Sequence, residues 1–403
     1  MRILIVSINV APWGGSEELW KSLALKGLAE SHEVMVSVFA HQKRNQNLTE
    51  LKEQGAILHQ RPLPSYYNEQ PFAYRALSEL KSRLGMDKTS MDWRAVGAWK
   101  PEVVVISSGE TFDHYLHHQS FLISYCKENR IPFYLISQRN WEWDMAVDQD
   151  FRESRKRLIE NCQGFFFVSY QNYKMACSQL AQDIPRARII QNPLRVNFKN
   201  NLPFPASNIP KMAYVARLET SIKGQDLFLQ ALSSSRFSSL KFELTFFGSG
   251  PDEQHLRGLV KYYGLEGKVF FGGHVADVSE IWRNHQLVVL CSVAEGTPLS
   301  LIEAMACGRT GLVTQVGDSA IWLSSTGFVA AGHRVENIQK ALQEALDAFP
   351  NWEKLGLKCK RRVIEKRDPE EIYALLECVV GKRDLDNTGQ DPEEFLSKMT
   401  RED

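Results

Sequence analysis

The sequence predicts an α/β protein made of two doubly wound parallel sheets, and three observations support this fold class. The chain has 403 residues, more than a single hydrophobic core ordinarily holds, so we expect two domains. Short apolar runs alternate with helical patterns along most of the chain, which is typical of βαβ units. A stretch over 192–210 is rich in proline and asparagine and has little periodicity, which indicates a connection between domains.

The predicted strands of the first half are apolar runs at 2–8, 34–39, 103–106, 133–136, 165–168 and 188–190. Those of the second half lie at 212–216, 242–247, 268–271, 287–291 and 312–313. Basic and aromatic residues mix with acidic ones over 66–100, where we predict a solvated helical pair rather than a membrane-surface patch. Helical patterns follow at 335–348, 351–365 and 369–379, and the polar tail over 382–403 is a candidate for mobility.

Composition argues against several classes of protein. The 48 basic and 48 acidic side chains balance, which argues against nucleic acid as the main partner. No apolar run approaches the roughly 18 residues that span a bilayer, and the chain enters a strand directly after Met1, so we predict a cytoplasmic protein. The seven cysteines form no Cys-x-x-Cys pair and are interpreted as buried free thiols. No Gly-x-Gly-x-x-Gly fingerprint supports a nicotinamide dehydrogenase.

Two carboxylates flank a predicted strand-to-helix turn, Glu295 on the loop and Glu303 near the start of the helix. Pro298 suits the beginning of that helix and Gly308 its left-handed end. Open α/β sheets bind ligands at the carboxyl ends of their strands, where helix N–H groups face outward. The stretch is therefore a candidate ligand site.

Other loops at predicted strand ends carry basic residues or glycines. Arg217 and Lys223 flank the loop after the strand at 212–216 and could converge on an anion, although basic residues around a turn are usually just solvated. Gly14 and Gly15 follow the first strand, and a Gly-Ser-Gly-Pro turn follows the strand at 242–247. Both turns permit close approach of a phosphate, and both are also ordinary tight turns.

Polar and aromatic side chains follow two neighbouring strands of the first half. They are Glu110, Asp113, Arg139, Asn140 and Trp141. Such groups suit a sugar acceptor, which presents apolar faces with hydroxyl rims, while caps and surface turns are the alternative interpretation.

A set of residues spread along the chain matches a known family in order and spacing. The set is Gly14-Gly15 with Glu18, Asn192-Pro193, Ala216-Arg217-Leu218 with Lys223-Gly224, Gly248 to Pro251, Gly272, Glu295 to Gly308, and Gly317. Through these residues the chain resembles the GT-B glycosyltransferases of family 4, also called glycosyl transferases group 1. Only the stretch with two glutamates is strong by itself. Together the anchors cover the chain from Met1 to about Gly317.

The resemblance implies two Rossmann-like domains facing across a cleft. The N-terminal domain, 1–200, would bind the acceptor, and the C-terminal domain, 201–365, the nucleotide-sugar donor. A helix over 366–381 would return to the N-terminal domain, ahead of the tail at 382–403.

The resemblance also implies roles for individual residues. Arg217 and Lys223 would hold the diphosphate, Glu295 the hydroxyls of the transferred sugar and Glu303 the ribose. Further donor contacts would come from Gly14, Gly15, Gly248, Ser249, His274, Val275, Gly296, Thr297, Pro298 and Leu299, with His274 and Val275 near the base.

A departing nucleoside diphosphate carries negative charge, which Arg217, Lys223 and the helix start at Pro298 could stabilise. We therefore expect no metal and no other cofactor, and interpret the Asp-x-Asp patterns at 148–150 and 384–386 as surface. The resemblance further implies retention of anomeric configuration, with front-face attack in which the leaving phosphate helps to take the acceptor proton.

The predicted function is that of a retaining glycosyltransferase acting on a UDP-sugar, with UDP-glucose as first guess, and on a glycan or lipid-linked acceptor. A nucleotide-sugar hydrolase or epimerase, or a catalytically silent binding relative, are the alternatives. Peripheral membrane contact and oligomeric state are left open. The chain departs from the family in having Gln138-Arg139-Asn140 where many relatives have a histidine, in Arg309-Thr310, and in Asp318.

Overall fold

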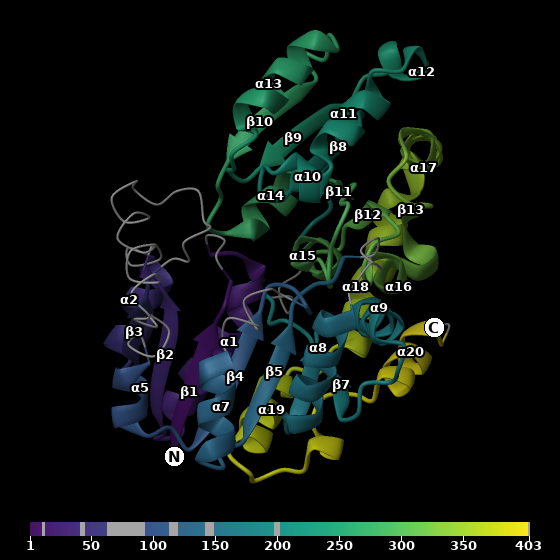
Figure 1. Cartoon of the computed structure of the whole chain (residues 1–403). Helices are drawn as coiled ribbons and strands as arrows, with labels where there is room; N and C mark the ends of the chain where they lie inside the picture. The colour runs from purple at the N-terminus through teal and green to yellow at the C-terminus, as the bar shows by residue number, and fades with distance from the viewer. Residues whose placement is uncertain are drawn as a thin grey trace. The chain divides into compact units, whose positions relative to one another are not determined.

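The computed structural model describes residues 1–9, 13–40, 45–62, 93–112, 120–141, 149–196 and 202–401. The chain divides into two compact units. Unit 1 comprises Met1–Pro193 and Pro369–Pro392, and unit 2 comprises Leu194–Asp368 and Glu393–Asp403. Both contain a parallel sheet with helices, as the sequence predicts (Figure 1).

Unit 1 is built on a seven-stranded sheet of order β3-β2-β1-β4-β5-β6-β7. All of its strand pairs are parallel. The strands are β1 (Arg2–Ser7), β2 (Glu33–Phe39), β3 (Ile57–Arg61), β4 (Val103–Ser108), β5 (Phe133–Ser137), β6 (Gly164–Phe167) and β7 (Ala187–Ile189). The helices are α1 (Gly15–Ala29), α2 (Gln46–Glu53), α5 (Arg94–Trp99), α7 (Ser120–Glu128), α8 (Gln149–Asn161), α9 (Tyr170–Leu180) and α19 (Glu371–Val379).

Burial on both faces explains the continuous apolar runs of these strands, as is usual in parallel sheets. Leu4 and Ile5 of β1 are completely buried. The strands turn polar where they end, and register places Ser7 beside Ser107 and Ser108 beside Ser137. The carboxyl edge of this sheet therefore carries hydroxyl groups.

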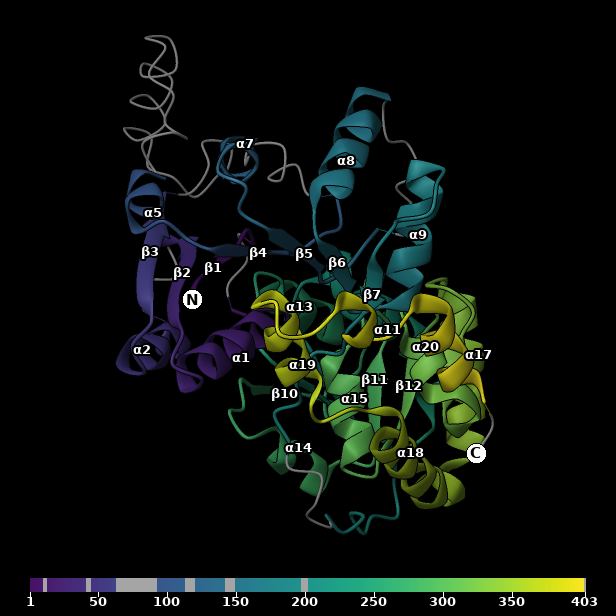
Figure 2. The same ribbon diagram turned by 90° about the horizontal axis from the view of Figure 1, so that it is seen from below.

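The predicted return of the chain to its first half is confirmed by helix α19. Its Leu375 and Leu376 are buried in the same core as Ile3 and Val34. Figure 2 shows α19, in yellow, beside α1, and the two helices are in contact.

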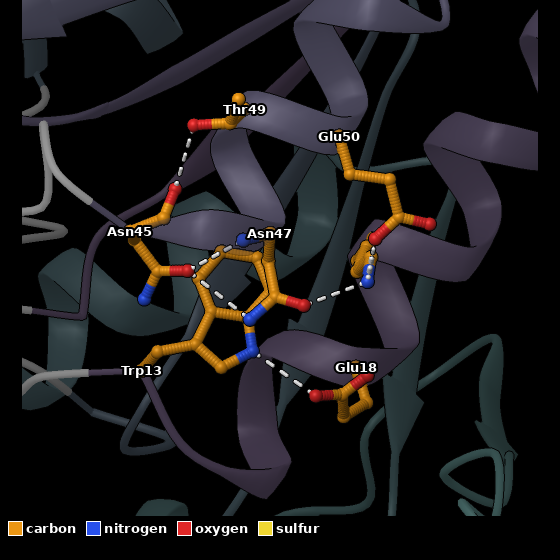
Figure 3. Close-up of polar contacts among 7 residues, drawn as sticks. Trp13, Glu18, Asn45, Asn47, Thr49 and Glu50 are labelled. Carbon is orange, nitrogen blue, oxygen red and sulfur yellow. Dashed lines mark hydrogen bonds and ion pairs between the residues drawn. The ribbon is translucent and has the colours of Figure 1, made fainter. Parts of the chain in front are cut away.

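A polar network joins α1 to α2 (Figure 3). Lys21 Nζ donates to Asn47 Oδ1 at 2.7 Å and to Glu50 Oε2 at 2.6 Å.

A second polar contact lies at the start of α1, where Trp13 Nε1 donates to Glu18 Oε1 at 3.0 Å. Glu18 thus contacts the indole ahead of its own helix.

Unit 2 is built on a six-stranded parallel sheet of order β10-β9-β8-β11-β12-β13. Its strands are β8 (Lys211–Val215), β9 (Glu243–Phe247), β10 (Val269–Gly273), β11 (Leu287–Leu290), β12 (Thr310–Thr314) and β13 (Phe328–Ala330). Its helices are α10 (Thr220–Lys223), α11 (Gln225–Leu232), α12 (Ser235–Ser238), α13 (Glu253–Tyr262), α14 (Val278–Asn284), α15 (Leu299–Ala306), α16 (Ser319–Leu323), α17 (Val335–Asp347), α18 (Trp352–Lys366) and α20 (Pro392–Thr400).

The expectation of a mobile polar tail over 382–403 is corrected by the structure. Within the tail, α20 buries Phe395 and Met399, each only 1% exposed, and joins unit 2. These two apolar residues are spaced four apart and so share one helix face. Arg188 Nε also donates to Leu385 O at 3.2 Å, which attaches the start of the tail to unit 1.

Two short edge strands, β3 and β13, are missing from the predicted elements. Each is only partly buried, and neither shows a long apolar run. The predicted helical pair over 66–100 lies largely outside the described residues, with α5 at its end. No helix in the described part of the chain is both long and apolar enough to cross a bilayer.

Candidate functional site

The loops that follow β8, β9, β11 and β12 form one continuous surface, called here the unit 2 edge. Backbone hydrogen bonds join these loops in pairs. Leu218 N donates to Ser249 O at 3.1 Å, and Val293 N donates to Ile222 O at 2.8 Å. Asp318, where the family often has a glycine, donates its backbone N–H to Gly296 O at 3.0 Å and is completely buried.

Two glycines of this edge lie against the loop after β11. A Cβ on Gly224 would lie 2.1 Å from Cys291 O, and one on Gly317 would lie 2.0 Å from Gly296 O. Both glycines also have positive φ, +62° and +52°. A side chain at either position would push the neighbouring backbone away.

The glycines of the Gly-Ser-Gly-Pro turn lie in the same way against the loop after β8. A Cβ on Gly248 would lie 2.1 Å from Ala216 O, and one on Gly250 would lie 2.2 Å from Leu218 O. Close packing against the loop after β8 thus explains why these two positions are glycine. A contact of Gly248 or Ser249 with a ligand stays a prediction.

Lys223 and Glu295 are brought together across two loops. Lys223 Nζ donates to Glu295 Oε1 at 2.6 Å, and Ser292 Oγ donates to the same oxygen at 2.8 Å. The Lys223 and Glu295 side chains are 23% and 12% exposed. The Tyr214 hydroxyl donates to the Lys223 carbonyl and anchors this end of α10. The pair is therefore fixed by its surroundings and still reachable from solvent.

Arg217 lies on the same loop as Lys223 and pairs with Glu219, with Nε 3.4 Å from Oε2. Gln225 Nε2 donates to Arg217 O at 2.7 Å, which holds the backbone that carries the guanidinium. The side chain is 38% exposed, so Arg217 can turn toward an anion at little cost.

Glu303 is completely buried on α15 and is bound by Arg195. Arg195 Nε lies 3.1 Å from Oε1 and Nη2 lies 3.3 Å from Oε2, a two-pronged contact. The backbone N–H of Arg195 also donates to Oε1 at 3.3 Å. Sequence reasoning missed Arg195, because a single arginine in a stretch without periodicity gives no signal.

The remaining predicted donor residues of unit 2 lie on this edge or on the neighbouring loop after β10. Helix α15 begins at Leu299, with Pro298 as its N-cap, and Thr297 and Leu299 are each 8% exposed. The first-turn N–H groups of a helix have no partner within it. His274 is exposed and Val275 half-buried just after β10, and Gly248 N donates to Gly273 O at 2.7 Å, which connects that loop to the edge.

In unit 1, Gly14 and Gly15 lie at the start of α1, around a buried carboxylate that sequence reasoning missed. Glu17 is 1% exposed and accepts from Gly14 N at 2.8 Å, Asn9 Nδ2 at 2.7 Å and Ser16 Oγ at 2.7 Å. Burial raises the pKa of Glu17 to about 7, against the lowering effect of these hydrogen bonds. The third position of a helix favours a glutamate that binds the capping backbone, which was the available signal.

The predicted acceptor residues separate into two groups. Arg139 Nη2 lies 2.6 Å from Glu110 Oε1, and the guanidinium lies 4.8 Å from the centre of the Trp141 ring. Asn140 is 3% exposed and donates to Gln179 Oε1 at 2.8 Å, so it supports the loop from inside. Asp113 lies outside the described residues.

Gln138, which takes the place of the family's histidine, is 7% exposed, and its Oε1 accepts from Asn192 Nδ2 at 3.0 Å. It therefore lies inside the carboxyl edge of the unit 1 sheet. The departure at Arg309 has a structural explanation in unit 2, where the buried guanidinium donates to the carbonyls of Pro203, Trp282 and His285.

The Asp-x-Asp pattern at 384–386 lies on the surface, where the Asp386 side chain is 87% exposed and pairs with Arg188. In the second pattern, Asp150 is exposed and Asp148 lies outside the described residues. The described part of the chain holds no group of three or more His, Cys, Asp or Glu residues that could bind a metal ion.

A groove of about 520 Å³ lies between α11 and α17 of unit 2, lined among others by Leu227, Gln230, Val335 and Gln339. None of the predicted site residues lines it. The candidate site is therefore identified by the charged side chains that lie together on the unit 2 edge, and not by the groove between α11 and α17.

Solved structures establish the class of fold. HepE from Anabaena, solved with UDP, has a TM-score of 0.69 at 15% identity, over 95% of this chain and 100% of that one. A glycosyltransferase from Rickettsia africae has a TM-score of 0.70 at 12% identity, over 95% of this chain and 99% of its own. The chain has the GT-B fold, which it shares with these structures.

Part of unit 2 matches a family model. Residues 209–348 match the glycosyl transferases group 1 model, which confirms the resemblance stated above for this part of the chain. Mannosylfructose-phosphate synthase of Agrobacterium fabrum is 38% identical over 110 residues, 25% of this chain and 24% of that protein. The chain thus covers only about a quarter of that relative.

Proposed function

We propose that the protein is a retaining, metal-independent glycosyltransferase that moves a sugar from a nucleotide diphosphate sugar to a glycan or glycolipid acceptor. One observation carries the proposal. Three cations of unit 2 each pair with a carboxylate, as Lys223–Glu295 and Arg217–Glu219 on the unit 2 edge and Arg195–Glu303 beside α15. All but Arg195 lie within the matched residues 209–348.

Such a set of pairs suits a ligand that has both phosphates and hydroxyl groups. When the donor binds, its diphosphate can take over Lys223 and Arg217, and its sugar hydroxyls can donate to Glu295. The exchange keeps every charge in contact with an opposite charge or a hydrogen-bond partner, which limits the cost of desolvation.

The same cations would drive the reaction. Negative charge builds on the β-phosphate as the bond to the sugar breaks, and preorganised cations stabilise such charge most when it develops. Lys223, Arg217 and the N-terminus of α15 supply this stabilisation without a metal. The acceptor hydroxyl attacks from the face that the phosphate leaves and passes its proton to that phosphate, so configuration is retained.

Glu295 and Glu303 are not an acid and base couple in this proposal. Each is held by a cation, Glu295 by Lys223 and Glu303 by Arg195, and these contacts occupy the oxygens that an acid or base would use. Glu295 would bind the hydroxyls of the transferred sugar and Glu303 the ribose. Conversion of Glu303 to Gln should therefore weaken nucleotide binding more than it slows turnover.

UDP-glucose is the first donor to test, because HepE of Anabaena has been solved with UDP-glucose. The acceptor would bind to unit 1 through Glu110, Arg139 and Trp141, with Gly14 and Gly15 as contacts to the donor diphosphate. A guanidinium beside a tryptophan and a carboxylate offers the ring and the hydrogen-bonding groups that sugars require.

The experiment incubates the full chain with UDP-, GDP- and ADP-glucose in the presence of a chelator, with and without oligosaccharide or lipid-linked sugar acceptors. Transfer is followed by release of nucleoside diphosphate, and the product anomer is assigned by nuclear magnetic resonance. Acceptor-dependent release with a retained anomer supports the proposal. Release without an acceptor product would indicate a hydrolase, and binding without release a silent relative.

A further inference from the structure

Helix α18 packs one face tightly into unit 2. It lies beside α15 (Figure 2), and a Cβ on its Gly356 would lie 2.1 Å from Gly308 O. Trp352, Cys359 and Val363 on the same face are completely buried. These contacts fix the rotation of the helix about its axis, so its opposite side is turned to solvent.

The opposite side is called here the outer face of α18 and consists of Lys354, Leu357, Lys358, Arg361 and Ile364, all of them exposed. Leu357 is 60% exposed and Ile364 is 53% exposed. The two are separated by two helical turns, so they line up along the helix. Single exposed apolar residues are normal on a protein surface, but two in line can enter an apolar phase together.

Basic side chains surround this pair of aliphatic residues. Three belong to the outer face, and half-buried Lys360 lies at its border. The carboxylates of Glu353 and Glu365 lie beside them, so basic groups exceed acidic ones. The chain as a whole is neutral, with 48 basic and 48 acidic side chains, so this excess is local. Lysine and arginine can lay their alkyl stems along apolar surface while their charged ends stay in a polar layer.

We propose that the outer face of α18 is a docking surface for a membrane that contains anionic lipids. Leu357 and Ile364 would enter the boundary between head groups and acyl chains, with α18 parallel to the membrane plane. The lysine and arginine side chains would bind lipid phosphates, because an anionic membrane surface attracts each nearby cation. No nucleotide takes part, so the inference goes beyond the proposed function and does not depend on it.

The combination of apolar and basic groups on one face favours a membrane over other occupants. Nucleic acid is bound by cations and by stacking on aromatic rings, and it offers no apolar layer to two aliphatic side chains. A second copy of this chain, docked through the same face, would bring like charges together, which opposes association. A membrane with anionic lipids satisfies both kinds of side chain at once.

Flotation with vesicles tests the proposal on the full chain without nucleotide. The vesicles contain phosphatidylcholine alone or with an equal part of phosphatidylglycerol, at low and at high salt. One variant, Leu357→Gln with Ile364→Gln, removes the aliphatic pair and keeps good helix formers in α18. A second variant, Lys354→Glu with Lys358→Glu, reverses two of the charges. Thermal unfolding would verify that both variants fold as the parent does.

Matched controls alter other exposed residues of unit 2. Lys241→Glu with Lys261→Glu changes the net charge by the same amount as the second variant. Tyr262→Gln removes a side chain that is 80% exposed. Sedimentation of the protein alone shows whether it self-associates, and a labelled oligonucleotide in place of the vesicles measures binding to nucleic acid.

We expect the parent to bind phosphatidylglycerol vesicles about tenfold or more tightly than phosphatidylcholine vesicles, with weaker binding at high salt. Both α18 variants should bind about tenfold or more weakly than the parent, because each loses two side chains that contact the membrane. The controls should stay within about twofold of the parent.

Absence of vesicle binding by the parent, or equal binding by the parent and the α18 variants, would overturn the inference. Self-association of the parent that is lost in Leu357→Gln with Ile364→Gln would assign the face to a second copy instead. Tighter binding to the oligonucleotide than to the vesicles would assign it to nucleic acid. Either result would equally rule out the membrane.

Discussion

The carboxyl edges of the two sheets are built differently. The unit 2 edge carries glycines packed against carbonyl oxygens and cation–carboxylate pairs that remain partly exposed, such as Arg217–Glu219. The unit 1 edge carries buried neutral groups, Ser107 and Gln138 among them, and the buried carboxylate of Glu17. Charges that can exchange partners suit a charged donor, whereas a buried polar edge suits shape and hydrogen bonding to a neutral molecule.

The largest effect should come from adding a side chain where the loops of the unit 2 edge meet. Gly317→Ala would place a Cβ 2.0 Å from Gly296 O at a φ of +52°. We expect unit 2 to lose about 3 kcal/mol or more of unfolding free energy, because strain and displaced backbone add together. Urea unfolding would measure this loss.

Gly258 provides the control, because its Cβ would meet nothing within 4 Å and it lies inside α13. Gly258→Ala should be neutral or stabilise by about 1 kcal/mol, the helix preference of alanine over glycine. Equal stability of the parent and Gly317→Ala would show that the loops are not locked together.

In unit 1, the pH dependence of stability should follow Glu17. Its pKa rises from 4.5 to about 7 on folding because of burial. A raised carboxyl pKa contributes stability that is complete below the unfolded value and is lost as the pH rises through the folded one. Glu17→Gln cannot ionise, so from about pH 4.5 to about pH 8 its stability relative to the parent should improve by about 3 kcal/mol.

Urea unfolding of both proteins at several pH values measures this change. Glu18→Gln is the matched control, since the neighbouring carboxylate accepts from Trp13 and is not buried (Figure 3). A pH profile of Glu17→Gln parallel to that of the parent would contradict the burial of an ionisable group at this edge.

Loss of a partly exposed cation from the unit 2 edge should affect turnover rather than folding. Lys223→Ala should lower kcat on the order of 10²-fold, as removal of one preorganised charge stabiliser does. The melting temperature should change little, since the lysine is partly exposed. Lys241→Ala, an exposed lysine of the same unit, is the control, and equal kcat of Lys223→Ala and the parent would refute the assignment.

A smaller effect is expected from Arg139→Ala in unit 1. The guanidinium lies beside Glu110 and Trp141, both partly exposed, and such contacts contribute on the order of 1 kcal/mol. KM for the acceptor should rise by about fivefold, with KM for the donor unchanged. A change confined to the donor KM would place the acceptor elsewhere, and exposed Arg157→Ala serves as control.

The sequence predicted the unit 2 edge better than the unit 1 edge for physical reasons. Two carboxylates on either side of a strand-to-helix turn are unusual enough to be visible in a single chain, so the stretch from Glu295 to Glu303 stood out by itself. Lys223 did not, and its role was assigned only through the family resemblance. Arg195 did not, because its partner lies more than a hundred residues away and only folding brings the two together.

Burial was the information that the sequence lacked in unit 1. Glu17 and Glu18 are adjacent and chemically alike, yet one is 1% exposed and the other partly exposed. Asn140, predicted as an acceptor contact, instead donates inward to Gln179. The buried face of α20 was missed for the same reason, because the mostly polar composition of the tail gave no indication that Phe395 and Met399 are buried.

In the proposed function, the unit 2 edge binds a nucleoside diphosphate without a metal. Thermal unfolding of the full chain with UDP, GDP and ADP in the presence of a chelator tests it directly. A ligand at about 100 times its Kd should add about 2.7 kcal/mol of stability, and this gain should shrink in Lys223→Ala. Absence of stabilisation by all three nucleotides would contradict the claim.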